Sequence, residues 1–258
     1  MMPDLVRWDG FALHTYGLMW AIGIWLAILR GLRAAPRYGI RAEDVFDLAF
    51  GMVVAGIVGG RLLYVLTNWE SYRGDWWGVV RLWEGGMSYF GGFAAGALAG
   101  LWMVRRRGLN AWQVADLAAP SLALAYAIAR IGCFAAGCCY GRPTSLPWGV
   151  QFPGLTAPVH PTQLYSTLMN LAIFLVLTRI EPQRKFQGQL FARFLILHGI
   201  YRFLIEFLRA GATSAPIWGL LTYGHLVALV VVGLGIYLYV RKRVAPSPLP
   251  SPPSGKRA

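Results

Sequence analysis

The chain has 258 residues, of which 57% are hydrophobic and only 14% are charged. A soluble domain usually carries about a quarter charged residues, so this composition excludes an ordinary soluble enzyme and indicates a polytopic membrane protein. The net charge of +13 could suggest a nucleic-acid partner, but the 24 Lys and Arg residues separate apolar runs and form no single basic surface. We therefore expect a membrane as the environment and no nucleic acid as a partner.

Seven apolar segments approach the length that a helix needs to cross a bilayer. They are Tyr16–Leu32, Val45–Leu66, Met87–Val104, Trp112–Ile131, Thr162–Leu177, Gln189–Leu208 and Ile217–Val240. The predicted fold class is an all-α integral membrane protein, a bundle of about seven transmembrane helices. Residues 1–243 would form one transmembrane domain, whose polar start, Met1–Leu13, lacks a signal-peptide pattern and is expected to stay in the mature protein. Residues 244–258 are rich in Pro, Ser, Lys and Arg, which predicts a disordered, basic cytoplasmic tail.

The distribution of basic residues predicts the orientation. Fifteen Lys and Arg residues flank the segments on one side, five flank them on the other, and Arg61, Arg130, Arg193 and Arg202 fall inside segments. Cytoplasmic flanks carry the excess of Lys and Arg. The N-terminus is therefore expected outside, the C-terminus in the cytoplasm, and the stretch after Arg130 at the outer face.

The stretch ARIGCFAAGCCYGR, from Ala129 to Arg142, ends the fourth apolar segment. A charge at the position of Arg130, within hydrocarbon, costs about 2.5–3.5 kcal/mol and indicates a functional site with a partner for that charge. The alternative is an arginine that only reaches out to the lipid headgroups.

The sixth segment contains HGIYRFLIEFLR, in which His198, Arg202, Glu206 and Arg209 fall within about 80° of helix surface. Arg202 and Glu206 stand four residues apart and can pair directly. A charged face on a spanning helix must look into a cavity or onto another helix. The alternative is a buried ion pair that only fixes helix packing.

The fifth segment opens with HPTQLY, from His160 to Tyr165, and Pro161 is a natural first residue of a helix. The start of a helix favours an anion such as a phosphate, and His160 is either a general acid or base or a hydrogen-bonded capping residue. Arg61, Arg130 and Arg202 could line one cavity open to the outer half of the membrane. Arginine there suits the phosphate of a phospholipid headgroup, because its planar fork donates two parallel hydrogen bonds.

All three cysteines of the chain, Cys133, Cys138 and Cys139, lie in one short stretch. Their number and crowding do not fit a disulfide framework, and their spacing without a nearby histidine fits no zinc pattern. If helix persists through the stretch, residues five or six apart are too distant for an unstrained disulfide. We expect no metal here and small buried packing residues; the alternative is a covalent nucleophile at Cys133 or Cys138.

Taken together, these motifs resemble the prolipoprotein diacylglyceryl transferase family, over nearly all seven segments. The matching pieces are YGLMW at Tyr16, GGRLLY at Gly59, GGMSYFGG at Gly85, ARIGCFAAGCCYGR at Ala129, HPTQLY at His160 and YRFLIEFLR at Tyr201. The resemblance implies phosphatidylglycerol as donor and the lipobox cysteine of a secreted prolipoprotein as acceptor. The reaction would form a thioether and release glycerol phosphate at the outer face of the bacterial inner membrane, with no metal or organic cofactor.

The resemblance also implies roles for individual residues. Arg130 and Arg202 match the essential arginines that would hold the phosphate, Glu206 matches their acidic partner, and His160 is the candidate for taking the thiol proton. The expected substrate-binding residues are Tyr16, Arg61, Gly141, Arg142, Gln163, Tyr165 and Arg209.

Several polar positions of the family pattern are replaced in this chain. Phe90 stands for a histidine, Cys133 for an asparagine, Cys138 and Ser166 for glutamates, and His225 for a glutamine. The phosphate-facing arginines are kept while these partners have changed. Two alternatives therefore stay open: a diverged member that transfers a lipid group to another acceptor, and a non-catalytic phospholipid-binding membrane protein.

Overall fold

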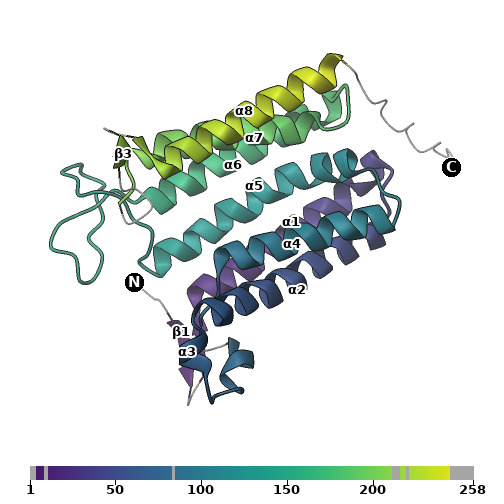
Figure 1. The fold of residues 1–258 in the computed structure, drawn as a ribbon. Helices are drawn as coiled ribbons and strands as arrows, with labels where there is room; N and C mark the ends of the chain where they lie inside the picture. The colour runs from purple at the N-terminus through teal and green to yellow at the C-terminus, as the bar shows by residue number, and fades with distance from the viewer. Residues whose placement is uncertain (1–3, 9–10, 83–84, 211–215, 219–220, 245–258) are drawn as a thin grey trace. The chain divides into compact units, whose positions relative to one another are not determined.

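The computed structural model describes residues 4–8, 11–82, 85–210, 216–218 and 221–244, and its described part is mostly helical (Figure 1). Seven described helices have 18 or more residues. They are α1 (Thr15–Ala34), α2 (Ala42–Thr67), α4 (Tyr89–Arg106), α5 (Ala111–Ala135), α6 (Thr162–Ile180), α7 (Gln189–Glu206) and α8 (Tyr223–Val244). Shorter pieces are α3 (Trp69–Tyr72) and the 3₁₀ turns η1 (Ala35–Tyr38), η2 (Gly78–Val80) and η4 (Glu181–Gln183).

Five of these described helices, α1, α2, α5, α6 and α8, are long and apolar enough to cross a membrane. Helix α4 is diluted by glycines, and α7 carries Arg193, Arg202 and Glu206 within 18 residues. The prediction of an all-α membrane protein is confirmed in this coarser form.

The seventh predicted segment was wrong at its start. Residues 217–222 were expected to be helical, but Pro216–Trp218 (β3) and Leu221–Thr222 (β4) pair as antiparallel strands, and α8 begins only at Tyr223. Such a short apolar, β-branched stretch reads equally well as helix or strand from its pattern. The polar start of the chain likewise forms a hairpin, Asp4–Trp8 (β1) against Phe11–His14 (β2). The predicted tail, 244–258, lies outside the described residues except for Val244.

The chain divides into two compact units. One contains the described parts of residues 1–31 and 115–251, and the other contains residues 32–114. In the second unit, α2 and α4 approach closely through glycines. A Cβ on Gly59 would lie 2.8 Å from the Gly91 carbonyl oxygen, and one on Gly92 would lie 3.1 Å from that of Gly56. Small residues at both helices permit this spacing.

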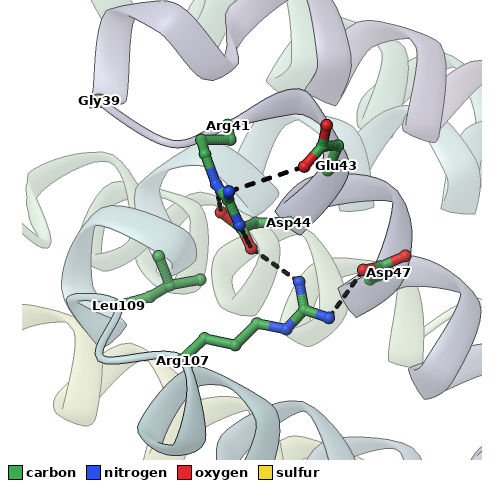
Figure 2. Close-up of a pocket in the computed structure, with 7 residues that line it drawn as sticks. All are labelled: Gly39, Arg41, Glu43, Asp44, Asp47, Arg107 and Leu109. Atoms are coloured by element: carbon green, nitrogen blue, oxygen red, sulfur yellow. Dashed lines mark hydrogen bonds and ion pairs between the residues drawn. The ribbon is translucent and has the colours of Figure 1, made fainter.

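An ion-pair network joins the start of α2 to the end of α4 (Figure 2). Arg107 donates to Asp44 and to Asp47, both at 2.7 Å, and Arg41 Nε donates to Asp44 at 2.9 Å. The pocket around them is also lined by Gly39, Glu43 and Leu109. Asp44 is buried, so its two arginine partners compensate a carboxylate that would otherwise be expensive to bury.

In the first unit, α6, α7 and α8 lie side by side (Figure 1). Gly199 of α7 and Gly235 of α8 allow the closest approach, because a Cβ would meet Val232 at 2.6 Å and Ile196 at 2.8 Å. At the other end of the unit from the candidate site, Asp116 of α5 accepts the backbone N–H of Gly188 at 2.7 Å and of Phe191 at 2.9 Å. This carboxylate satisfies free donors at the start of α7.

Candidate functional site

Most of the predicted site residues come together at one end of the first unit, where α5 and α7 end and α6 begins. The segment after α5 is clamped there. Three backbone hydrogen bonds form this clamp. The Gly141 N–H donates to the His160 carbonyl at 2.9 Å, the His160 N–H to the Arg142 carbonyl at 3.0 Å, and the Arg142 N–H to the Leu208 carbonyl at 2.8 Å. A Cβ on Gly141 would lie 2.8 Å from the Cβ of His160 and would collide with the Leu208 carbonyl oxygen. The predicted glycine is therefore required by close backbone approach.

The first turn of α6 holds the cysteine segment through side chains. Thr162 Oγ1 donates to the Cys139 carbonyl at 2.8 Å, and Gln163 Nε2 donates to the Cys138 carbonyl at 2.6 Å. Gln163 is fully buried, and no described residue donates to its Oε1. Tyr165 lies on the same turn. Its hydroxyl accepts from Trp148 Nε1 at 2.8 Å and lies 3.4 Å from His160 Nδ1.

Arg130 lies in the last two turns of α5, next to this clamp. One guanidinium nitrogen donates to the hydroxyl of Tyr126, and the guanidinium carbon lies 4.7 Å from the centre of that ring. Its Nη1 lies 4.0 Å from Cys133 Sγ. No carboxylate among the described residues pairs with Arg130, so the protein leaves its positive charge uncompensated at close range.

Behind Arg130, polar side chains form a connected path between α5, α6 and α7. The Tyr126 ring packs on Tyr201, with centroids 6.4 Å apart, and the Tyr201 hydroxyl donates to Ser166 Oγ at 2.5 Å. One turn further along α6, Asn170 Oδ1 lies 2.9 Å from His198 Nδ1. Tyr126, Tyr201 and Asn170 were not among the predicted site residues; the signal that could have found them was a polar side chain within an apolar segment.

Arg202 and Glu206 form the predicted ion pair across one turn of α7. Glu206 is 0% exposed and also accepts the Thr222 hydroxyl at 3.0 Å, while Arg209 Nε lies 3.9 Å from its other oxygen. Gly224 packs directly against this carboxylate, because a Cβ there would collide with it. Thr222 and Gly224 were not predicted, since only the fold brings them to α7.

His225, where the resemblance implies a glutamine, packs next to Thr222 and Phe207. It is fully buried, its Nδ1 accepts the Thr222 N–H at 3.1 Å, and its ring lies 4.3 Å from that of Phe207. Tyr126, which holds Arg130, packs on His198 with ring centroids 5.2 Å apart, and His198 stands one turn before Arg202 on α7, so the two charges belong to one region of this unit.

Tyr16 reaches this region from the start of α1. A Cβ on Gly132 of α5 would lie 3.2 Å from the backbone of Tyr16 and 2.8 Å from Met19, so the two helices touch at this glycine. The Tyr16 side chain is partly exposed and interacts electrostatically with Cys133. The structure thus brings Tyr16, Gly141, Arg142, Gln163, Tyr165 and Arg209 to the same end as Arg130, His160, Arg202 and Glu206.

Arg61 differs from the expectation. Its side chain belongs to the second unit, is 5% exposed, and directs all five N–H groups at backbone carbonyls of the segment after α3. The acceptors are Gly78 at 2.6 Å, Val79 at 2.9 Å, Arg81 at 3.1 Å, Gly85 at 2.5 Å and Gly86 at 2.8 Å. No donor remains for a phosphate oxygen in this structure, so Arg61 anchors this segment. Phe90, in the same unit, is 76% exposed.

The three cysteines gather closely because helix α5 does not continue through them. It ends at Ala135, and the chain turns with positive φ at Gly137 (69°) and at Cys139 (62°). All three Sγ atoms lie within 4.8 Å of one another. Hydrogen bonds from the thiols of Cys133 and Cys138, with Arg130 nearby, lower the pKa of the Cys139 thiol. The condition under which these sulfurs would be too far apart, a helix that persists through the stretch, is therefore not met.

The fold and this site describe a helical membrane protein that gathers arginines, a buried carboxylate and a histidine at one end of its helices. The sequence model of the family described as prolipoprotein diacylglyceryl transferase matches residues 3–241, so the chain belongs to that family.

Curated relatives are similar over most of their length. A Polynucleobacter asymbioticus protein is 36% identical over 93% of this chain and 95% of its own, and a Geobacter sulfurreducens protein is 35% identical over 95% and 97%. Both are named phosphatidylglycerol–prolipoprotein diacylglyceryl transferase. A Clostridium perfringens protein, 32% identical over 89% of this chain and 91% of its own, carries that name with the number 2.

Proposed function

We propose that this protein is a transferase that moves the diacylglyceryl group of phosphatidylglycerol onto the lipobox cysteine of a prolipoprotein. Family membership and the names of the relatives support the reaction. The structural observation that carries the proposal is the presence of two arginines, Arg130 and Arg202, at one end of the unit. Arg202 is tied to buried Glu206, and Arg130 meets no carboxylate among the described residues.

The reaction is a substitution at carbon. The acceptor sulfur attacks the glyceryl carbon that bears the phosphate ester, the C–O bond breaks, and glycerol phosphate leaves with the bonding electrons. A thioether replaces the ester, and the thiol proton passes to a base. Negative charge grows on the phosphate, and arginine donors fixed in advance stabilise such charge more in the transition state than in the ground state.

Each arginine would act in its own way. Arg130 offers the positive charge that binds the phosphate, and Tyr126 fixes its orientation. Arg202 is oriented by Glu206, which Thr222 and Arg209 hold in place in turn. Gly141, Arg142 and Arg209 would form the backbone and guanidinium wall of the headgroup site. Tyr16, Gln163 and Tyr165 would contact the substrate.

His160 is the proposed acceptor of the thiol proton, and Tyr165 lies next to its Nδ1. A cysteine thiol has an ordinary pKa near 8.5, so a few per cent is already thiolate at neutral pH and the base assists an acceptor that is partly ionised.

The proposed placement is multi-pass in the bacterial inner membrane, with residues 1–243 acting as one transmembrane domain. All seven long helices would cross, including α4 and α7, with the N-terminus outside and the C-terminus in the cytoplasm. Support comes from the excess of basic flanks on one side. It also comes from the helix ends at the site, where α5 ends, α6 begins, α7 ends and α8 begins. The site would then open toward the outer face. No metal or organic cofactor takes part in the proposed transfer.

The test in cells uses a strain depleted of its own diacylglyceryl transferase. Supplying this chain should restore prolipoprotein that carries a diacylglyceryl group, measured by mass. The matched control is Arg130→Ala at equal membrane abundance, which should restore little. Unmodified prolipoprotein in cells that hold well-inserted wild-type chain would contradict the proposal and favour another acceptor or a lipid-binding role.

A further inference from the structure

The three cysteines form a cluster that the transfer reaction does not use. Cys133 is buried in the last turn of α5, Cys138 is half-buried and Cys139 is exposed. They are the only cysteines in the chain, and all three Sγ atoms lie within 4.8 Å of one another.

The backbone holds the sulfurs together before any ligand arrives. Cys138 N donates to the Cys133 carbonyl at 3.1 Å, and the carbonyls of Cys138 and Cys139 accept from Gln163 and Thr162 of α6. Cys139 is the one non-glycine residue with positive φ among those the structure describes. A side chain held in that unfavourable conformation needs support from its surroundings, and here the conformation turns its sulfur toward the other two.

We infer that Cys133, Cys138 and Cys139 form a three-thiolate site for a soft metal ion, with monovalent copper as the ion that fits best. Three sulfurs placed about 2.3 Å from a central ion in a trigonal plane lie about 4.0 Å apart. The sulfurs of this cluster need only a small closure to reach that spacing. This inference reverses the expectation drawn from residue spacing, which did not anticipate the turn after Ala135.

The number and type of ligands select the ion. Thiolates favour monovalent copper and zinc, but zinc takes four ligands. Among the described residues, no histidine or carboxylate joins the three sulfurs. A three-ligand sulfur site therefore suits monovalent copper better than zinc.

The surroundings also fit the charge of a loaded site. Three thiolates around one monovalent ion carry a net charge of −2, which is unfavourable near a membrane unless positive charge lies close by. Arg130 Nη1 lies 4.0 Å from Cys133 Sγ, so a loaded site would share the positive charge that the proposed function assigns to the phosphate. Binding displaces the thiol protons, which pass to the solvent.

The test titrates the purified full-length chain in detergent with monovalent copper, without oxygen, against a coloured copper chelator. We expect one ion per chain, and protection of all three thiols from a thiol reagent. Cys139→Ser, at the exposed position, should weaken binding more than about 100-fold, since loss of supporting groups around a metal ligand alone costs 10–100-fold. Ser145→Ala, in the same loop region, leaves all three sulfurs in place and should bind as the wild type does.

Three results would overturn the inference, and none depends on transferase activity. One is three reactive thiols with no bound copper. Another is a single reactive thiol with a mass two hydrogens lower, which would mean a disulfide. The third is tighter binding of zinc than of copper in the same assay.

Discussion

Arg130 and Arg202 differ in what surrounds them, and this difference shapes their expected roles. Arg202 shares its charge with buried Glu206, whereas Arg130 faces a tyrosine hydroxyl and ring. A pair with a buried carboxylate fixes geometry but offers little net charge. Under the proposed function, Arg130 would supply most of the attraction for a phosphate, and Arg202 would supply donors whose orientation Glu206 fixes.

Removing either guanidinium should slow the reaction strongly. Arg130→Ala and Arg202→Ala should each lower turnover by about 10²–10³, the usual loss for one donor to developing negative charge. Lysine at either position should recover little, because it lacks the planar fork. Turnover is measured with purified variants in lipid vesicles. Arg193→Ala is the control, since Arg193 lies on α7 but contacts Tyr239; near-normal rates for Arg130→Ala would contradict the phosphate role.

His160 should matter mainly near neutral pH. His160→Ala should lower the rate at pH 7 by about 10–30-fold if the imidazole takes the thiol proton, because only a few per cent of the acceptor is then thiolate without help. The deficit should shrink as the pH rises toward the thiol pKa of about 8.5, because the acceptor then ionises without help. A pH–rate profile of the variant measures this. A deficit that stays constant from pH 6 to pH 9 would mean that His160 only caps α6.

The arrangement of the helices at the site depends on one clamp, formed by the backbone of Gly141 and Arg142. Gly141 and Arg142 pass between the start of α6 and the end of α7, with hydrogen bonds to His160 and Leu208. Both helices are thereby held to the segment that leaves α5. A shift in this segment would move Arg130 and Arg202 relative to each other.

Gly141→Ala should therefore reduce both stability and turnover. The added Cβ would collide with the Leu208 carbonyl oxygen and lie 2.8 Å from His160, and such overpacking costs about 1–3 kcal/mol. Thermal unfolding in detergent and turnover in vesicles provide the two measurements. Gly233→Ala is the matched control, because nothing lies within 4 Å of the Cβ added there. Equal melting temperatures for the two variants would contradict the clamp.

Local patterns predicted the long helices and the ion pair, because both depend on residues near one another in sequence. Arg202 and Glu206 are four residues apart, and that spacing alone fixes their contact on a helix. Thr222 and Gly224 reach Glu206 only through the strand pair before α8, which an apolar run such as IWGLLTYG conceals. Arg61 was placed on the phosphate because a sequence does not reveal which backbone carbonyls a buried guanidinium will meet.

Composition and helix length define a membrane protein, and the match over residues 3–241 assigns its family. The two arginines that carry the resemblance argue for the family's donor, while Phe90 stands where the resemblance implies a histidine. We expect transfer that is real but slow, with His160 and the intrinsic acidity of the thiol supplying what the missing histidine does not.

The most direct test combines the purified full-length chain, vesicles that contain phosphatidylglycerol, and a synthetic peptide with a lipobox cysteine. We predict that the peptide gains the mass of one diacylglyceryl group and that an equal amount of glycerol phosphate appears. Vesicles of phosphatidylcholine alone should give neither product. An unmodified peptide thiol, from a chain shown to be folded and inserted in phosphatidylglycerol vesicles, would contradict the assigned reaction.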